Sequence, residues 1–566
     1  MKTKNLLKKL LFTIALCTPL LLNAQADTRG MDFWFTFGSN AGQPLFGGWN
    51  DVSLQIRIVG SGQATTGNIH FTELGTSVPF SVTANGVFTY DLTYEEMEAV
   101  YNYWSSGGNP ESSVSSRSVR ITSSAPVMVY ALNQAPATTD ATNLLPVPVL
   151  GTDHFQISYT PLGGFHDAYA VVAVEDNTRV YHAGTLAATL NAGQVYFRTS
   201  EMDMTGTRIT SDKPIAFFVM TTCINVPVGF SACDVQFQQL APVNTWGRNF
   251  FVPVTHVGVE RVRIVASQDG TDITVVGGTL PAVIPLGSQN RLTNLDAGQW
   301  VELEIRLADR GAFIQANNPV GVCSYLVGVN YPGNLVRQGD PSTAWVPAIE
   351  QMIPSATIAP FIPLGSTNLI SHFALVVVQT AYKDLTTVAI GGGVPAPISG
   401  GTWYDHPTAG YSYYILQLPN NAALSYTFSN PEGLFVMGYG LGQAESYYYI
   451  AGSAFRRLDA AFFANDVHNQ DLVVNPFNVS GINFRAEIQG DDISTNPGHI
   501  RWFIDGVEDV SLIDQLTWNR NFPNGTYSIV LEILTSDNFT IRRIEGTLII
   551  AIPSIVVNPH IRKSPQ

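Results

Sequence analysis

ITSSAPVMVYALNQ, residues 121–134, has three counterparts further along the chain. They are ITSDKPIAFFVMTT (209–222), IQANNPVGVCSYLV (314–327) and TFSNPEGLFVMGYG (427–440). In each stretch, β-branched and aromatic residues flank a short polar run that contains a proline, a pattern typical of two strands joined by a turn. A β-hairpin alone cannot bury its apolar face. We therefore predict four copies of one hairpin, each of which completes the core of its neighbour.

A second element marks a tight turn before a strand in three of the copies. It consists of an Asp, a Thr two residues later and a β-branched residue two further on, and it occurs at Asp176, Asp269 and Asp384. The Asp supplies the bend, and the β-branched residue starts the return strand. Because the same aspartate recurs at equivalent places, we interpret it as structural rather than catalytic.

A third element fixes the length of the copies. An Ala-Gly pair precedes a strand at Gly193, Gly298 and Gly410, and each glycine lies 21 residues before the proline of its hairpin, at Pro214, Pro319 and Pro431. In the first copy the corresponding distance, from Gly86 to Pro126, is 40 residues. The surplus corresponds to residues 93–112, where Thr93 and Glu96 form a capping-box pattern that predicts a helix. We expect this helical insertion to lie outside the β core.

The starts of the copies share a Gly, a polar residue two positions on and an aromatic residue four positions on, at Gly30, Gly151 and Gly247. The fourth start is inferred from the other elements. We predict four tandem β repeats with about eight strands each: segment 1 (30–146), segment 2 (147–242), segment 3 (243–347) and segment 4 (348–455). Because the segments abut, the favoured arrangement is a propeller-like ring with two four-stranded blades per segment. A string of β-sandwiches is the alternative.

The region after residue 455 has a different pattern. Alternating strands over 456–550 predict a small β-sandwich, with Trp502 and Tyr527 as core residues. Residues 551–566 are expected to form a tail.

The composition agrees with an all-β fold. Charged residues make up 13% of the 566 residues and aromatic residues 11%, and there are 49 Gly and 33 Pro. Such a chain is rich in turn and strand formers and too long for one ordinary core. The net charge of −15 argues against a nucleic-acid partner, because nucleic-acid binders carry clustered Lys and Arg.

The N-terminus predicts export. Four lysines precede a short apolar run, and Ala24-Gln25-Ala26 resembles a cleavage site, so residues 1–26 are interpreted as a signal peptide. The expected location is extracellular, on the outer-membrane surface or in the periplasm, and no transmembrane segment is expected. In such a compartment Cys223 and Cys233 are expected to form a disulfide, with two buried thiols as the alternative. Cys323 lies in an apolar strand and is expected to be packed.

Sequence motifs that carry catalysis are missing. There is no HExxH, GxSxG or P-loop pattern, and no cofactor is expected. Asp491 and Asp492 lie in a turn-like stretch that is interpreted as a solvated loop, with a calcium site as the alternative.

A family resemblance is carried by four stretches of the sequence: GMDFWFTF (30–37), AVEDNTRV (173–180), AGQ (192–194) and ITSDKPIAFF (209–218). Residues 30–460 resemble the amino-terminal domain of the IgGFc-binding protein family, found in secreted mucosal proteins and in surface proteins of Bacteroidetes-type bacteria. The region that follows resembles PKD or immunoglobulin-like modules. The resemblance implies that the partner is immunoglobulin Fc or a mucin-type glycoprotein.

A signal peptide, a repeated β scaffold with variable loops and no catalytic motif together predict a secreted or cell-surface binding protein that acts by adhesion and is not an enzyme. A glycan-active enzyme and a structural envelope component are the alternatives.

Overall fold

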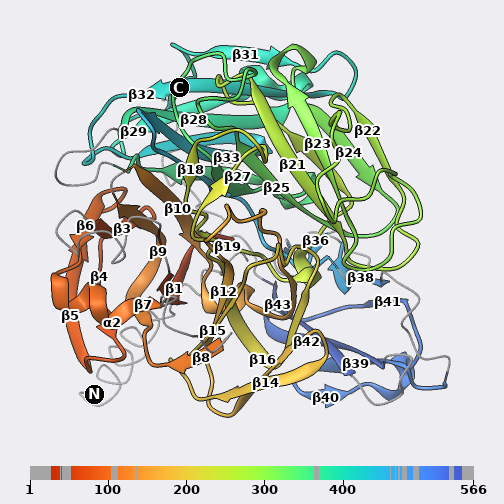
Figure 1. The fold of residues 1–566 in the computed structure, drawn as a ribbon. Helices are drawn as coiled ribbons and strands as arrows, with labels where there is room; N and C mark the ends of the chain where they lie inside the picture. The colour runs from red at the N-terminus through yellow and green to blue at the C-terminus, as the bar shows by residue number, and fades with distance from the viewer. Residues whose placement is uncertain are drawn as a thin grey trace, which may run out of the picture. The chain divides into compact units, whose positions relative to one another are not determined.

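The computed structural model describes residues 27–38, 40, 53–102, 112–135, 137–361, 369–458, 460–465, 467–469, 472–474, 481–488, 496–534 and 541–550. Residues 26–459 form one compact body, here the large body, and the described residues from 460 onward belong to another, the small body. Almost every element is a strand, so the all-β prediction is confirmed (Figure 1). The predicted signal peptide and the tail lie outside the described residues.

The proline stretch does not form a hairpin, so that prediction is wrong. One continuous strand runs through the proline in β9 (Val119–Ala135), β16 (Arg208–Val219) and β33 (Tyr426–Gly442). In segment 3 the strand is interrupted between β24 (Ala312–Ala316) and β25 (Val320–Leu326). A polar run with a proline fits a turn and a bend within a strand equally well, and here the chain bends.

The bend is where the long strand changes partners. Before Pro126, β9 pairs with β1 (Gly30–Phe35) and β4 (Thr65–Phe71), and after it with β3 (Ser53–Gly60) and β10 (Thr138–Leu144). Proline has no N–H to give to a ladder, so it is tolerated where the pairing changes. A strand that switches partners in this way turns the corner between two sheets packed at an angle.

The same exchange of partners occurs in the other three segments. In segment 2, β16 pairs first with β11 (Gly151–Phe155) and β13 (Thr178–His182), then with β12 (Asp167–Ala173) and β19 (Gln238–Gln239). In segment 3, β24 pairs with β20 (Asn249–Val252) and β22 (Ile273–Val276), and β25 with β21 (Val259–Ala266) and β26 (Ser342–Trp345). In segment 4, β33 pairs with β27 (Ile353–Ile358) and β29 (Thr387–Ile390), then with β28 (Leu369–Gln379) and β34 (Ser446–Gly452).

Further strands extend these sheets. They are β5 (Thr76–Val82), β6 (Val87–Asp91), β14 (Thr185–Leu190), β15 (Val195–Ser200), β23 (Trp300–Arg306), β30 (Ala396–Pro397), β31 (Thr402–Asp405) and β32 (Tyr411–Leu418). The described strands form a seven-stranded sheet in segment 1, eight-stranded sheets around segments 2 and 4, and sheets of three and four strands in segment 3. Segments 1, 2 and 4 therefore do not divide into the two separate four-stranded blades that were expected, because the bent strand joins both halves.

The glycines at the segment starts are explained by close packing. A Cβ on Gly30 would lie 2.2 Å from Cβ of Pro146, and one on Gly151 would lie 2.4 Å from Cβ of Pro242. Each of these prolines precedes a 3-10 turn, η2 (Val147–Val149) or η3 (Val243–Thr245), that leads into the next segment. The strand register also shifts at two of these starts, between Gly30 and Asp32 in β1 and between Gly151 and Asp153 in β11. The fourth start has no such glycine, but β27 shows an equivalent register shift, between Ile353 and Ser355.

The helical insertion is part of the core, so the expectation that it lies outside is wrong. Helix α2 (Tyr94–Val100) begins with the predicted capping box of Thr93 and Glu96. Met97, Val100 and Tyr101 are buried in the main core cluster. After the helix, β7 (Tyr101–Asn102) pairs with β2 (Phe37–Gly38), and β8 (Ser112–Ser115) pairs with β15 of segment 2. Residues 103–111 lie outside the described residues.

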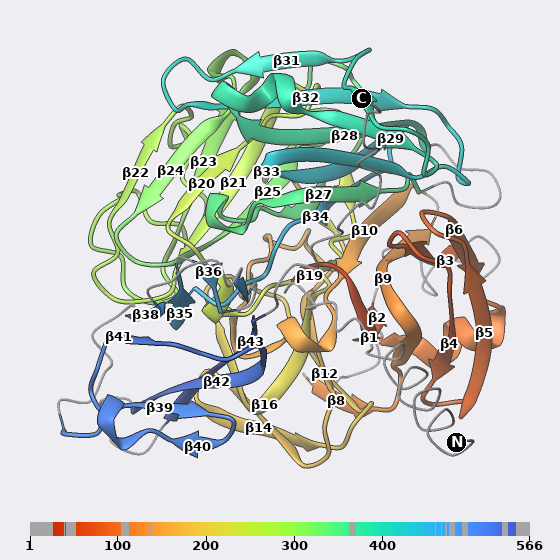
Figure 2. The same cartoon turned by 180° about the vertical axis from the view of Figure 1, so that it is seen from behind.

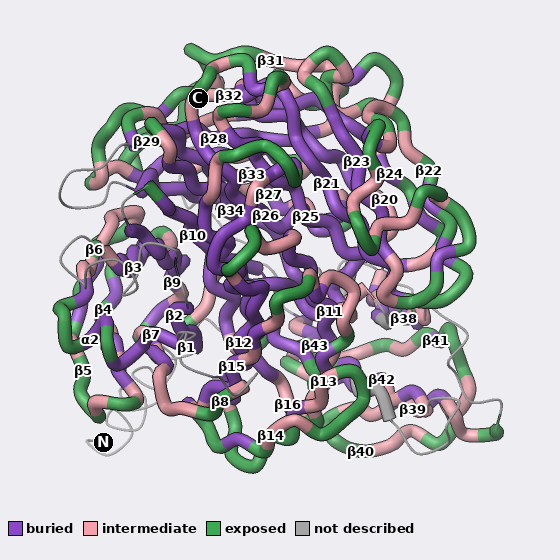
Figure 3. Tube along the Cα trace, in the orientation of Figure 1, coloured by how far each residue is buried: buried purple, intermediate pink, exposed green. Residues whose placement is uncertain are grey.

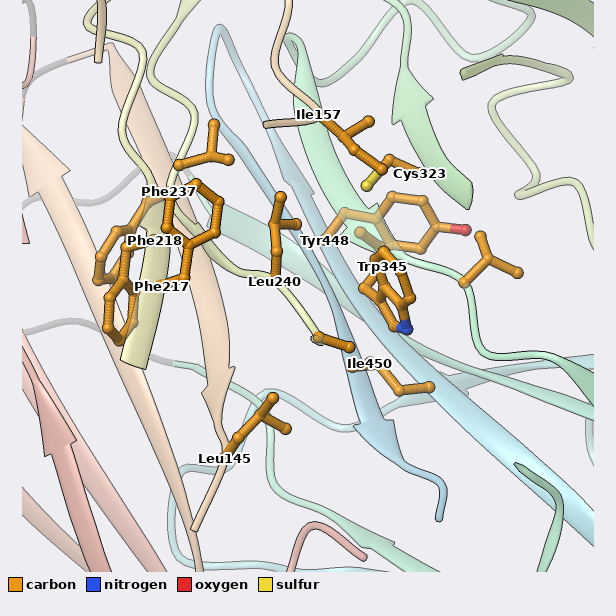
Figure 4. Packing of buried hydrophobic residues seen from close by; sticks show 14 of the residues in the cluster. Leu145, Ile157, Phe217, Phe218, Phe237, Leu240, Cys323, Trp345, Tyr448 and Ile450 are labelled. Atoms are coloured by element: carbon orange, nitrogen blue, oxygen red, sulfur yellow. The ribbon is translucent and has the colours of Figure 1, made fainter. Parts of the chain in front are cut away.

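Neighbouring segments are joined by buried and partly buried contacts. Ser118 Oγ donates to the Gly193 carbonyl (2.7 Å), which links segments 1 and 2. His256 Nδ1 lies 2.8 Å from Tyr439 Oη, which links segments 3 and 4. One core cluster contains residues of all four segments, as Figure 4 shows for Leu145, Phe217, Phe218, Phe237, Cys323, Trp345, Tyr448 and Ile450.

Segments 2 and 3 share a buried cation. Arg263 is 0% exposed and lies between the rings of Tyr159 and Trp300, 4.0 Å and 4.1 Å from their centroids. Its Nη1 donates to Asp203 Oδ2 at 2.8 Å and its Nε to Glu302 Oε2 at 3.2 Å. Removing one of the two carboxylates would leave the buried guanidinium only partly compensated and should be destabilising, by up to about 3–5 kcal/mol, the range typical for breaking a buried ion pair.

The small body contains two sheets over one core. One sheet has the order β36 (Val467–His468), β35 (Ala460–Ala464), β38 (Ile482–Ile488) and β41 (Thr517–Arg520). The other has the order β37 (Val473–Val474), β43 (Ile541–Ile550), β42 (Gly525–Leu534), β39 (Ile500–Ile504) and β40 (Val507–Glu508). Trp502 is fully buried between them, and Tyr527 packs at the edge of the same cluster.

Candidate functional site

We call the last strand of each segment (β10, β19, β26 or β34) its central strand. The connection that leads into the central strand from the bent strand, or from β25 in segment 3, differs between segments. In segments 1 and 4 it is a tight hairpin, in which Ala135 pairs with Thr138 and Leu441 with Ser446. In segments 2 and 3 it is long, and we call residues 220–237 loop 2 and residues 327–341 loop 3. Long loops on a rigid scaffold are common places for recognition, so these two loops are the candidate site.

Loops 2 and 3 pack against each other. The Gly328 N–H donates to the Val226 carbonyl at 2.9 Å, and the amide of Asn330 donates to the Ser231 carbonyl. The rings of Phe230 and Tyr331 meet edge to face with centroids 4.9 Å apart. The two segments therefore contribute one continuous surface.

A disulfide constrains loop 2. It joins Cys223 to Cys233, whose Cα atoms lie 5.5 Å apart across the short strands β17 (Ile224–Asn225) and β18 (Cys233–Asp234). The cross-link holds the tip of the loop in a narrow set of conformations, so little entropy remains to be lost when a partner binds.

Apolar side chains are prominent among the exposed residues of this surface, which also include Ser231, Asn330 and Arg337. Val228 is 53% exposed, Phe230 36% and Leu335 65%. Residues 223–233 contain no charged side chain. A rigid surface with an accessible aromatic ring and few charges matches the central part of many protein interfaces.

Beneath the loops lies a cluster of four buried carboxylates, one from each segment. Asp140 comes from β10, Asp234 from loop 2, Asp340 from loop 3, and Glu445 from the hairpin before β34, and all are at most 3% exposed. β10 carries Asp140, β26 and β34 follow Asp340 and Glu445 in sequence, and all three strands are buried along their length, as Figure 3 shows.

Asp140 connects three segments through hydrogen bonds. Its Oδ1 accepts from Ser342 Oγ at 2.6 Å, and its Oδ2 accepts from the Phe237 N–H at 3.0 Å. Glu445 connects segment 4 to segment 1, because its Oε2 accepts from Gln134 Nε2 at 2.9 Å. The carboxylates therefore fix the central strands relative to one another.

Asp234 and Asp340 are less well satisfied. Asp234 Oδ2 and Asp340 Oδ1 are buried and accept no hydrogen bond from the described residues. Burial, followed by the charges of Asp340 and Asp140, raises the pKa of Asp234 well above its usual range. Burial is also the main cause that raises the pKa of Asp340, to about 7. Both carboxyl groups therefore keep a proton to higher pH than an exposed aspartate does, and both lie at the bases of the candidate loops.

The predicted turn aspartates have structural contacts. Oδ1 of Asp176 accepts from the Ala192 N–H at 3.0 Å, and Oδ1 of Asp269 accepts from the Ala297 N–H at 2.8 Å. Asp384 lies instead in the 3-10 turn η6 (Thr380–Leu385) and is exposed. The repeat glycines Gly193, Gly298 and Gly410 all have positive φ, at 82°, 81° and 74°.

The predicted prolines lie apart from the candidate loops. Pro126, Pro214 and Pro431 sit within β9, β16 and β33, and Pro319 directly precedes β25. The possible calcium ligands Asp491 and Asp492 lie outside the described residues. Within the described ranges, no group of three or more His, Cys, Asp or Glu side chains could hold a metal ion. In the same ranges no helix is long and apolar enough to cross a bilayer.

The four carboxylates were missed by sequence reasoning. Each stands shortly before or at the start of the last strand of its segment, in TDATN (139–143), CDVQF (233–237), DPSTAW (340–345) and ESYYY (445–449). An acidic residue in front of a strand looks like an ordinary turn residue. Its recurrence at the end of all four segments was the available signal.

Comparisons with known proteins point to one family. A model of the family described as IgGFc binding protein matches residues 140–440, a range that contains both candidate loops. The IgGFc-binding protein of Homo sapiens is 29% identical over 342 residues, which are 57% of this chain and 6% of the human protein. The chain thus spans a small part of that relative. A structure of Escherichia coli alpha-2-macroglobulin activated by porcine elastase overlaps 93% of this chain and 53% of its own, with 9% identity and a TM-score of 0.14, too low to inform on the fold.

Proposed function

Because the chain belongs to the IgGFc-binding protein family, we propose that it is a secreted or cell-surface binding protein that recognises a host glycoprotein, such as immunoglobulin Fc or a mucin, and acts by adhesion rather than catalysis. Export through the N-terminal signal peptide is part of the proposal. A disulfide between Cys223 and Cys233 supports it, because disulfides persist in oxidising compartments.

The observation that carries the proposal is the rigid apolar surface of loops 2 and 3. Val228 and Phe230 project from a disulfide-closed loop, and Tyr331 supports the ring of Phe230 from the next segment. A partner that covers this surface gains apolar burial without having to order the loops first.

The scaffold that presents these loops is, in this proposal, a closed ring of four β repeats. The shared exchange of strand partners supports the four repeats, and contacts between each consecutive pair of segments support the ring. Segments 1 and 4 also touch: β10 lies beside β34 (Figure 2), and Tyr130 Oη donates to the carbonyls of Thr357 (2.8 Å) and Ala451 (3.0 Å). In the same proposal the small body is an immunoglobulin- or PKD-like module.

A binding experiment with a matched pair of variants tests the function. The full chain is titrated against purified IgG Fc and against purified mucin by biolayer interferometry. Val228→Asp places a charge on the candidate surface, and Val394→Asp places the same charge at a position that is 90% exposed on segment 4. We expect Val228→Asp to weaken binding at least tenfold and Val394→Asp to leave it unchanged.

Two results would overturn the proposal. One is the absence of binding to both proteins, or equal loss in both variants. The other is hydrolysis of mucin glycans that a single Asp or Glu substitution abolishes, which would favour a glycan-active enzyme. A pull-down from whole cells that recovers only envelope components would favour a structural role.

A further inference from the structure

The small body carries a cleft whose lining residues lie outside loops 2 and 3. Its volume is about 660 Å³, within the range of ligand pockets, and it is open to solvent on one side of the sheet β35-β38-β41. Six lining residues alternate along these three strands and their ends: Phe463, Asn465, Asn483, Arg485, Thr517 and Asn519.

The period of the strands places these side chains together. Phe484 and Trp518 lie between them in sequence, are buried, and stack with ring centroids 3.9 Å apart. Because successive side chains of a strand point to opposite faces, the neighbours of Phe484 and Trp518 occupy the outer face. The pairing of Asn483 with Asn519 and of Arg485 with Thr517 brings them side by side.

The polar groups of the cleft form a row of amides. The Asn519 amide donates to Asn483 Oδ1, and the Asn483 backbone N–H donates to Asn465 Oδ1 at 2.9 Å. These contacts fix the orientation of the amides and leave further donor and acceptor capacity, because each side-chain amide has two N–H groups and a carbonyl with two lone pairs.

The charges of the cleft are balanced. Arg485 forms an ion pair with Glu487 on the same strand, and its guanidinium lies 4.5 Å from the centroid of the Phe463 ring. The surface therefore offers no excess positive charge to an anion such as a phosphate or a sialic acid. It combines one aromatic ring with neutral hydrogen-bonding groups.

We propose that this cleft is a binding site for a neutral oligosaccharide. Sugar hydroxyls both donate and accept hydrogen bonds, which matches a fixed row of amides and Thr517. The C–H face of a sugar ring packs on an aromatic ring such as that of Phe463. The indole N–H of Trp518, which also lines the cleft, is buried and has no hydrogen-bond partner in the described part of the chain.

The site is separate in sequence from loops 2 and 3, so it extends the proposed function rather than restating it. If a glycoprotein is the partner, the loops would contact its polypeptide and the cleft would contact its glycans. The two contributions can be measured independently.

A glycan array tests the proposal. The full chain is applied to an array of neutral mucin-type oligosaccharides and their sialylated counterparts, and its thermal unfolding is followed in parallel. Asn519→Ala removes one amide from the cleft, and Asn290→Ala makes the same change at an exposed position of segment 3. We expect binding to neutral members of the array, a loss of at least tenfold in Asn519→Ala, and no loss in Asn290→Ala.

The outcomes separate this site from the loops. Binding to unglycosylated IgG Fc should persist in Asn519→Ala, and glycan binding should persist in Val228→Asp. The proposal is overturned if no neutral oligosaccharide binds, if only sialylated ones bind, or if Asn519→Ala binds as the unsubstituted chain does while retaining its melting temperature.

Discussion

Asp27 forms an antiparallel β-bridge with Ala454, so the beginning of the large body lies beside its end. A second core cluster reinforces this closure, because it combines Tyr130 and Leu132 of segment 1 with Phe428 and Tyr449 of segment 4. Neither segment has a complete core without the other. Removing one of these segments should therefore destabilise the other.

The contact between segments 1 and 4 predicts that removing the hydroxyl of Tyr130 lowers the stability of the large body. This group donates to two buried carbonyls of segment 4, so Tyr130→Phe should lower the free energy of unfolding by about 1–3 kcal/mol. Hydrogen exchange should rise in both β10 and β34. Tyr527→Phe is the control, because its hydroxyl donates to the Pro523 carbonyl at an exposed position of the small body. Equal stability of Tyr130→Phe and the unsubstituted chain would contradict the prediction.

Helix α2 should be essential to the fold of segment 1. Met97 is 6% exposed and belongs to the main core cluster, so Met97→Ala should destabilise by about 2–5 kcal/mol. Glu95→Ala, on the exposed side of the same helix, should cost less than about 1 kcal/mol. Urea denaturation measures both. Similar midpoints for the two variants would show that the helix is a dispensable insertion after all.

The loop 2 disulfide should be present in the protein purified from an oxidising compartment. Mass spectrometry without reduction should find the peptides of Cys223 and Cys233 joined, and two free thiols would refute this. Replacing both with Ser should lower stability by roughly 2–3 kcal/mol on the chain-entropy estimate for a short loop. It should also weaken partner binding, because Phe230 would lose its fixed position.

The spacing of sequence elements predicted more than the individual motifs did. The constant distance from the Ala-Gly turn to the proline located the inserted residues, and the pair Thr93 and Glu96 located the first turn of the helix. The helix packs inward because Met97 and Val100 meet a core that other segments help to build. The seven residues of the helix do not by themselves predict this packing.

The proline stretch was misread for a related reason. A polar run around Pro126 has the local chemistry of a turn, yet β9 continues through it. The deciding interactions are the pairings of this strand with β1 on one side of the bend and β3 on the other, both distant in sequence. The sequence equally failed to predict the roles of Asp234 and Asp340, because their burial depends on strands from other segments meeting around them.

The Asp340 carboxyl should contribute more to the stability of the large body in mildly acidic solution than in alkaline solution. A change of opposite sign below about pH 6.5 comes from three histidines whose pKa values are lowered by burial, His154, His256 and His372. Folding raises the pKa of Asp340 from 3.8 to about 7, so the folded state binds a proton that the unfolded chain releases in this interval. The stabilisation is complete below about pH 4 and is lost as the pH rises through 7, with an upper limit of about 4 kcal/mol. Asp140 and Asp234, whose pKa values are also raised, contribute a loss of the same sign as the pH rises.

Asp340→Asn isolates this effect, because the amide has the same shape and does not ionise. Between pH 5 and pH 8 the melting temperature of this variant should change less unfavourably than that of the unsubstituted chain, whereas Asp384→Asn, at an exposed turn, should follow the unsubstituted chain. A changed slope rather than a flat profile is expected, because other carboxyl groups with raised pKa values still titrate in the variant, namely those of Asp140, Asp167, Asp234 and Glu260. Since Asp340 anchors loop 3, binding to IgG Fc should weaken over the same pH interval, and Asp340→Asn should weaken less. Identical pH profiles for Asp340→Asn and Asp384→Asn would show that the carboxylate cluster does not control the stability of the large body.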